Sequence, residues 1–204
     1  TLSLHDALPI YGIANERLGQ SLQAFEQAFS DFFQPGQSME NRRKDSETMR
    51  SIVAEILFVL QSDKKDADFI PHVLMEKEKH EWSECELLSE ALINEYHVPK
   101  NAALAVTMLA WCKYLLRTDL DAVVIWAEQV WNVTNPDVSP STVAQEGIAR
   151  FQDFISQCGL SVTLREYGLR NFDSRRVAFR IARTDAVEVP TESDIQAIYE
   201  LAKG

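Results

Sequence analysis

AALAVTMLAWCKYLL, residues 102–116, is apolar on nearly every side when it is drawn as a helix. A helix that is apolar all round must be enclosed by other elements, so this segment predicts the centre of a helical bundle. Pro99 lies just ahead of it, and because proline disfavours helical geometry at the preceding residue, an earlier helix must end before Val98. Neither this run nor residues 52–60 reaches the roughly 18–20 apolar residues that cross a bilayer. We therefore expect no membrane partner.

Outward from this segment, apolar residues recur at steps of three and four through most of the chain. Leu18, Leu22, Phe25, Phe29 and Phe32 form the first such stripe, and Pro35-Gly36 ends it. The same spacing predicts helices over residues 46–60, 67–79, 82–96, 119–132, 140–159, 175–182 and 191–201. Residues 163–169 read as a turn or a short helical piece. With no convincing strand, the sequence predicts an all-α bundle of eight or nine helices.

Two details of these helices are specific enough to check. Leu60 closes the apolar stripe of residues 46–60, so it is expected to face the core. Thr118 followed by Asp121 predicts the cap of the helix over residues 119–132, and Ser139-Pro140 and Thr191 predict the starts of two later helices.

Charge and cysteine usage narrow the class of partner. The 204 residues carry 20 Lys and Arg against 31 Asp and Glu, a net charge of −11, which would repel a phosphate backbone, so we expect no nucleic-acid partner. Cys85, Cys112 and Cys158 contain no CxxC pair, so neither a disulfide framework nor a thiolate zinc site is indicated, and a cytoplasmic location fits best.

One stretch runs against the acidic balance. From Arg165 to Arg183 there are six arginines against Glu166 and Asp173, which makes this stretch +4 and the remainder −15. A phosphate or partner-docking site is one interpretation. Arginines that are solvated or paired within an acidic protein are the other, and charge patterning favours it.

Few side chains have the spacing of a catalytic or metal site. His72, Glu76 and His80 would share one face of a continuous helix, as metal ligands can, but the dense charge around them favours a solvated face. Glu86 and Glu90 lie one turn apart, so they could bind a cation or share a proton, or could simply be exposed. No Glu-x-x-His pair occurs, which excludes a ferritin-like di-iron bundle.

The first ten residues, TLSLHDALPI, resemble the translated read-through of a sequencing adapter. We interpret residues 1–10 as such an artefact and exclude them from the fold. On this interpretation we expect the natural protein to have lost an N-terminal part before Tyr11. A genuine N-terminus is the alternative.

Four ordered segments carry a family resemblance: HVPKNAALAVTMLAWCKY (97–114), WAEQVWNVT (126–134), FISQCGLSVTLREYGL (154–169) and IQAIYELA (195–202). Together they resemble the helical C-terminal domain of iron-containing alcohol dehydrogenases, in particular the branch of NADPH-dependent butanol dehydrogenases and aldehyde reductases. The resemblance implies that residues 11–204 form this dehydroquinate synthase-like helical domain, with the N-terminal nucleotide-binding domain absent from the chain.

In that family the nucleotide-binding domain holds NAD(P)H, and the helical domain holds a divalent metal, Fe or Zn, that polarises the substrate carbonyl as a Lewis acid. The resemblance implies a small-molecule alcohol or aldehyde as substrate if the protein is active. It leaves a homodimer as a candidate assembly. We expect no cofactor in the fragment itself, because its ligand positions differ from the family's.

By the resemblance, the family's first two metal ligands, an Asp and a His, fall on Gln23 and Gln27. The third and fourth, both His, fall on Glu86 and Lys100, and a further His credited with proton relay falls on Glu90. Glutamine offers only a neutral carbonyl oxygen, and a lysine ammonium opposes a cation, so no part of the ligand set is intact.

Three hypotheses follow. The first is a metal-free fragment of an alcohol dehydrogenase-like oxidoreductase, impaired or inactive as it stands. The second is a non-catalytic helical domain retained for oligomerisation or binding, which the substituted ligand positions favour. The third is a small-molecule binding domain in which Glu86 and Lys100 form an ion pair that anchors a ligand in the interhelical cleft.

Overall fold

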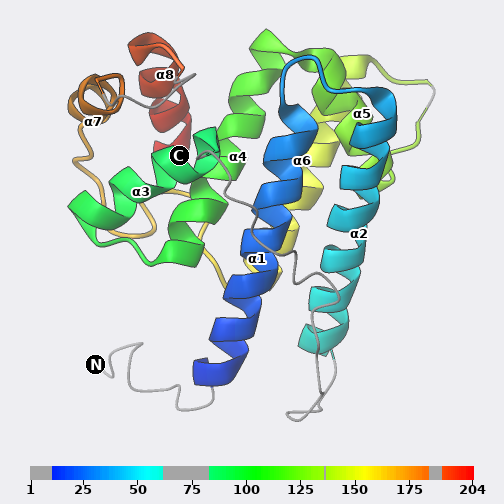
Figure 1. Cartoon of the computed structure of the whole chain (residues 1–204), viewed down its shortest axis with the longest axis horizontal. Coiled ribbons are helices and arrows are strands. Elements are labelled where there is room, and N and C mark those ends of the chain that lie inside the picture. The colour runs from blue at the N-terminus through cyan, green and yellow to red at the C-terminus, as the bar shows by residue number, and fades with distance from the viewer. Residues whose placement is uncertain (1–10, 62–82, 136, 184–189) are drawn as a thin grey trace.

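The computed structural model describes residues 11–61, 83–135, 137–183 and 190–204, with residues 11–17 as backbone only. Within these ranges the protein consists of eight α-helices and no strand, which confirms the all-α prediction (Figure 1). The helices are α1 (Tyr11–Phe33), α2 (Met39–Gln61), α3 (Glu84–Tyr96), α4 (Lys100–Thr118), α5 (Leu120–Trp131), α6 (Pro140–Gln157), α7 (Ser174–Ile181) and α8 (Glu192–Lys203). None of the described helices is long and apolar enough to cross a membrane.

Helix α4 is the centre of the bundle, as its sequence predicted. Every residue from Ala102 to Ala110 is buried, because α1, α3, α5, α6 and α8 all pack against it. In Figure 1, α1, α2, α5 and α6 lie on one side of α4, and α3, α7 and α8 lie on the other. The outer helices thus form two groups, and α4 lies between them and contacts both.

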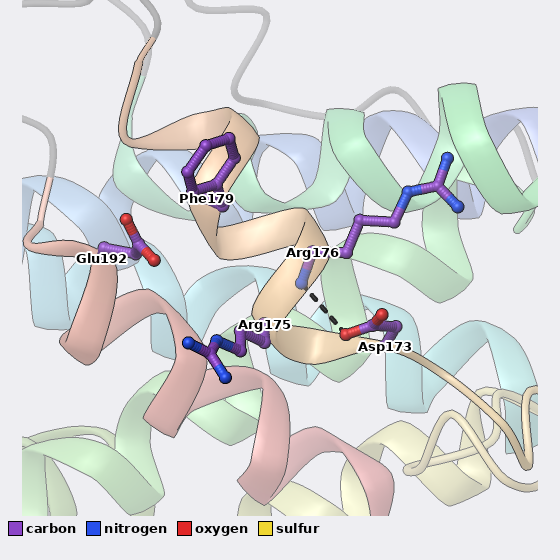
Figure 2. A pocket seen from close by; sticks show the side chains of 5 residues that line it. All are labelled: Asp173, Arg175, Arg176, Phe179 and Glu192. Atoms are coloured by element: carbon purple, nitrogen blue, oxygen red, sulfur yellow. Dashed lines mark hydrogen bonds between the residues drawn. The ribbon is translucent and has the colours of Figure 1, made fainter.

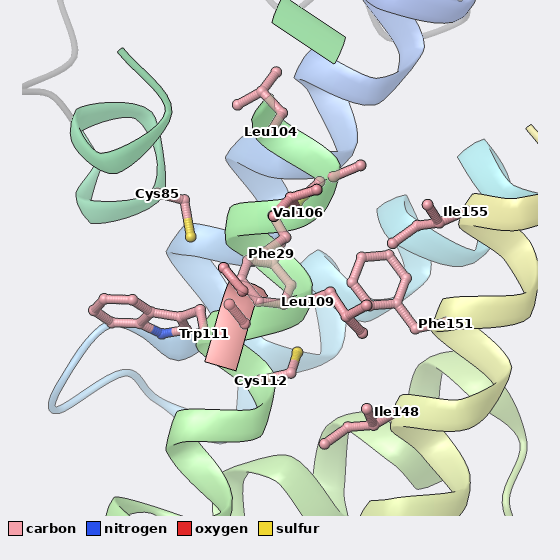
Figure 3. Packing of buried hydrophobic residues seen from close by; sticks show 14 of the residues in the cluster. Phe29, Cys85, Leu104, Val106, Leu109, Trp111, Cys112, Ile148, Phe151 and Ile155 are labelled. Atoms are coloured by element: carbon pink, nitrogen blue, oxygen red, sulfur yellow. The ribbon is translucent and has the colours of Figure 1, made fainter. Parts of the chain in front are cut away.

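Aromatic side chains fill the larger of these groups. The ring of Phe25 stacks on that of Phe151, with centroids 5.5 Å apart, and Trp126 meets Phe151 edge-on at 5.6 Å. Phe29 also contacts Trp126 edge-on at 6.1 Å. Figure 3 shows Phe29 and Phe151 close to Leu109 of α4. Each pair of this kind contributes about 0.5–1.5 kcal/mol beyond the burial of its area.

The helix starts follow local capping chemistry. Ser139 caps α6 with Pro140 in the first turn, and Thr191 forms a capping box with Asp194 at α8, as predicted. The cap of α5 is Asp119 rather than Thr118, because the carboxylate of Asp119 accepts the N–H of the third residue on, at 3.2 Å. An ionised cap is also favoured by the positive end of the helix dipole.

Two further expectations need correction. Helix α2 begins at Met39, seven residues earlier than predicted, because residues 40–45 show no apolar period although four of them, Glu40, Arg42, Arg43 and Lys44, are good helix formers. Leu60 is 47% exposed and does not join the core. Residues 163–169 form turns, which is the first of the two alternatives that the sequence left open. The predicted helix over residues 67–79, with His72, Glu76 and His80, lies outside the described residues.

A close approach between α5 and α6 at Gly147 gives a stability prediction. A Cβ atom placed on Gly147 would lie 2.3 Å from the Cβ and 2.9 Å from the Cα of Ala127, so the two backbones would have to separate. We expect Gly147→Ala to lower the free energy of unfolding by about 1–3 kcal/mol, despite the better helix propensity of alanine.

Gly19→Ala in α1 is the matched control for denaturant unfolding, since its new Cβ would meet only the flexible side chain of Asn101, at 3.0 Å. Equal stability of the two variants would contradict the packing argument.

Candidate functional site

A buried carboxyl group lies where α1 meets α3. Glu26 is only 1% exposed, and its side chain takes a place on the inner face of α1 between Leu22 and Phe29. Its Oε1 accepts two hydrogen bonds, from the hydroxyl of Ser30 at 2.7 Å and from the hydroxyl of Ser83 at 2.6 Å. Its Oε2 is buried and has no hydrogen-bond partner among the described residues. A half-satisfied buried carboxyl is unusual and marks this place in the molecule.

Ser83 joins this carboxyl to the start of α3. While its hydroxyl donates to Glu26, its oxygen accepts the backbone N–H of Glu86 at 3.0 Å, so Ser83 is also the N-cap of α3. The thiol of Cys85, on the same turn, is buried. Burial raises the pKa of Cys85 well above its ordinary value, and the nearby Glu26 raises this pKa further.

The environment makes Glu26 titrate near neutrality. Burial raises the pKa of Glu26 to about 7, while the hydrogen bonds from Ser83 and Ser30 lower it and the charges of Glu86 and Asp31 raise it. This carboxyl can therefore hold or release one proton near neutral pH. A titratable group shifted by burial together with specific partners is a candidate functional group.

Two further carboxyl groups, Asp31 of α1 and Asp45 of α2, lie close enough to repel each other. Burial, followed by repulsion from Asp31 of α1, raises the pKa of Asp45 to about 6. Gln27 turns toward this pair, because its side-chain amide donates to Oδ1 of Asp31 at 3.2 Å. Glu26 and Gln27 are adjacent in sequence, yet Glu26 bonds Ser83 at the start of α3 while Gln27 bonds Asp31 of its own helix.

The structure places the five residues of the implied metal and relay positions as follows. Gln23 and Gln27 are half-buried on α1, and Glu86 and Glu90 are half-buried on α3, where Oε2 of Glu90 accepts the amide of Asn94 at 3.0 Å. Lys100 is exposed and begins α4. Glu86 lies near Glu26 and acts on its pKa. Among the ion pairs of the described residues, none joins Glu86 to Lys100.

These side chains do not fit a divalent metal. The amide of Gln27 is engaged with Asp31, and Lys100 presents a cation. In the part of the chain that the structure describes, no group of three or more His, Cys, Asp or Glu side chains could hold a metal ion. The chemistry that the described residues offer at the contact of α1 with α3 is proton binding and hydrogen bonding.

A second feature lies at the edge of the smaller helix group. A hollow of about 400 Å³ is lined by Asp173, Arg175, Arg176, Phe179 and Glu192, at the junction of α7 and α8 (Figure 2). The carboxylate of Asp173 caps α7 by accepting the backbone N–H of Arg176 at 3.0 Å. We refer to the exposed side of α7, formed by Arg175, Arg176 and Phe179, as the α7 surface.

The arginine-rich stretch is partly paired within the protein. Arg180 forms an ion pair with Glu95 of α3 at 2.7 Å, and Arg183 forms one with Glu192 of α8 at 3.4 Å. Arg175 and Arg176 are exposed and have no ion-pair partner among the described residues. Both alternatives drawn from the charge pattern, pairing and solvation, thus occur in this stretch.

Sequence reasoning missed Glu26 and its two serine donors. Glu26 lies four residues after Leu22 and three before Phe29, so it belongs to the apolar stripe of α1 by spacing. An acidic residue inside an inward-facing stripe was the available signal. The donor Ser83 comes from another helix, and no local pattern points to that pairing.

Comparison with known proteins gives a fold but no sequence relative. No family model and no curated protein matches the chain. Among solved structures, NADH-dependent butanol dehydrogenase A from Thermotoga maritima matches 97% of this chain and 54% of its own, with a TM-score of 0.76 and 16% sequence identity. The aldehyde reductase YqhD from E. coli matches the same shares of the two chains, with a TM-score of 0.74 and 17% identity.

The fold is therefore that of the helical domain expected from the family resemblance. At this level of identity the likeness concerns fold alone. The chain spans about half the length of either solved protein.

The raised pKa of Glu26 gives a pH prediction. Because the folded-state pKa, about 7, lies above the ordinary value of 4.5, the folded protein binds more protons than the unfolded chain between these values. The free energy of unfolding should therefore fall as pH rises from 4.5 to 7, by about 2–3 kcal/mol from this group, and stay level above that.

The variant Glu26→Gln should lose this component of the pH dependence, measured by denaturant unfolding at a series of pH values between 5 and 8. Glu90→Gln, in which the altered carboxylate is partly solvent-accessible, is the control and should keep it. A Glu26→Gln variant with the wild-type slope would show that this carboxyl titrates normally.

Proposed function

We propose that this chain, over residues 11–204, is the helical half of an alcohol dehydrogenase-like oxidoreductase in which the metal-dependent step has been lost. The observation that carries the proposal is the match of 97% of the chain to about half of a butanol dehydrogenase and of an aldehyde reductase. The ordered sequence segments between residues 97 and 202 support the same relationship.

The substituted ligand positions support the second half of the proposal. Carbonyl reduction of this type draws on a cation that polarises the carbonyl oxygen. At the implied positions the chain offers the neutral amides of Gln23 and Gln27 and the ammonium group of Lys100, and the amide of Gln27 is bound to Asp31. These groups favour a metal-free state. Glu90, at the implied relay position, accepts a hydrogen bond from the side-chain amide of Asn94.

In this proposal the NAD(P)H site belongs to the part of the relatives that the chain does not cover, and an alcohol or aldehyde would be the substrate of the whole protein. A cytoplasmic location agrees with three buried cysteines that form no disulfide. A homodimer is the candidate assembly.

A non-catalytic binding or oligomerisation domain is the second candidate. The observation that favours it is that the bundle is completely packed around α4 while the implied ligand positions carry other polar groups. On this view, selection has kept the fold after the chemistry was lost.

Metal analysis tests the metal-free state. We expect protein purified without chelators to contain far less than one Fe or Zn per chain, because no described residues supply a ligand set. Elemental analysis by plasma mass spectrometry measures the content. A sample incubated with excess Zn²⁺ or Fe²⁺ and then gel-filtered is the control for metal lost during purification. Stoichiometric metal in either sample would contradict the proposal.

An activity assay tests whether the chain as it stands is inactive. We expect no oxidation of NADH or NADPH by this chain in the presence of butanal, because neither a nucleotide-binding motif nor a Lewis acid is available. The absorbance of the reduced nucleotide reports turnover, with the aldehyde reductase YqhD run in parallel as a positive control. Turnover that co-purifies with the chain would refute the proposal.

A further inference from the structure

The α7 surface combines positive charge with an exposed aromatic ring. Helix α7 buries Ser174, Val177, Ala178 and Ile181 against its neighbours. Its opposite side carries arginines and Phe179, which is 48% exposed. Arginine and aromatic residues are the types enriched in the centres of protein–protein interfaces.

Among the described residues, no ion pair neutralises the two arginines at the start of α7. Arg175 and Arg176 lie in the first turn of α7, where the positive end of the helix dipole disfavours a cation. Neither is paired with a carboxylate in the described ranges, although the chain has 31 acidic residues. Arg180 and Arg183, one and two turns further along, are paired. The two free guanidinium groups therefore remain available to a partner.

The exposed ring of Phe179 is held in place by a neighbouring arginine. The guanidinium of Arg183 lies over its ring, 3.3 Å from the centroid, and is itself fixed by the carbonyl of Phe179 at 2.8 Å and by Glu192 at 3.4 Å. One face of the ring is thus covered. The ring also lines the hollow at the junction of α7 and α8. A rigid aromatic group loses little conformational entropy on binding.

The directions in which Arg175 and Arg176 extend favour an extended partner over a single small anion. Figure 2 shows Arg175 extending toward the side of Glu192 and Arg176 extending to the other side of α7, as expected for consecutive helical residues, which do not face each other. A single phosphate could not contact both. An extended segment with several carboxylates that crosses α7 could contact both and could place an apolar side chain against Phe179.

Nucleic acid and anionic membranes fit less well. Each would bring an extended field of phosphates close to the rest of the chain, which carries −15 outside residues 165–183. A short acidic segment would meet Arg175 and Arg176, and among the residues that line the hollow it would face only the two carboxylates of Asp173 and Glu192. We propose that the α7 surface docks an acidic, aromatic-containing segment of a partner protein. The proposal does not depend on the oxidoreductase relationship.

Fluorescence anisotropy with a labelled peptide of ten residues, rich in Glu and Asp and with a central Phe, tests the proposal. We expect binding by the whole chain that weakens as salt rises, and a loss of about tenfold or more in affinity for Arg175→Glu with Arg176→Glu, since reversal creates repulsion. Phe179→Ala should weaken binding severalfold without changing the salt dependence.

The matched control is Arg43→Glu with Arg50→Glu, which makes the same change of net charge on exposed positions of α2, away from α7 in Figure 1. It should bind the peptide within about twofold of wild type once general electrostatics are allowed for. Circular dichroism of each variant verifies the helical fold. Equal losses in the two double variants, or no peptide binding by folded wild-type protein, would overturn the proposal.

Other occupants give distinguishable results. Displacement of the peptide by millimolar inorganic phosphate at constant ionic strength would indicate a small-anion site and refute the proposal, as would tighter binding of a single-stranded oligonucleotide or of phosphatidylserine vesicles. Asp185 and Glu188 follow Arg183 in the sequence, outside the described residues. If the peptide binds only when both are changed to their amides, the chain's own segment is the occupant and the partner proposal fails.

Discussion

The burial of α4 on all sides is the constraint on which the rest of the structure depends. A helix with eleven consecutive buried residues, Ala102 to Cys112, cannot lie at a surface, so five other helices pack around it. The polar group in the middle of this run, Thr107, bonds to carbonyls of its own helix and to the hydroxyl of Ser89 in α3, at 2.7 Å. Even this hydroxyl therefore serves the packing of α3 on α4. The polar groups of the two candidate sites lie instead where outer helices meet one another.

The contact between α1 and α3 is such a place, and there packing and polarity oppose each other. Glu26 occupies a position that an apolar residue could fill, and burial of its carboxyl costs free energy unless the group is neutral or well bonded. Two hydroxyl donors converge on one oxygen while the other has no partner among the described residues, so the compensation is incomplete. The interaction fixes the start of α3 through Ser83, and an apolar contact could not cap that helix.

Features that depend on residues within one helix were predictable from the sequence, and features that depend on contacts between helices were not. The central place of α4 follows from its composition, and the caps at Ser139 and Thr191 follow from residues within one turn. The first turns of α2 gave no signal because charged helix formers on a solvated helix show no apolar period. The choice of Glu95 as partner of Arg180 depends on how α7 lies against α3, which no pattern within either helix contains. Glu26 was overlooked as a candidate site residue because its partner Ser83 comes from another helix. Its position within the apolar stripe of α1 was visible in the sequence.

Helix α3 connects the two polar features of the molecule. Its N-cap, Ser83, bonds Glu26 of α1, and near its other end Glu95 bonds Arg180 of α7. Thirteen residues at 1.5 Å each make α3 a rod of about 20 Å, and the phenol of Tyr199 in α8 donates to the carbonyl of Leu88 midway along it, at 2.8 Å. These three contacts hold α3 near its start, at Leu88 and near its end. The same helix therefore fixes the position of Ser83 beside Glu26 and of Glu95 beside Arg180 of α7. Because the apolar contacts of α3 with α4 also oppose movement of this helix, the two features are joined by a stiff connection rather than by a hinge.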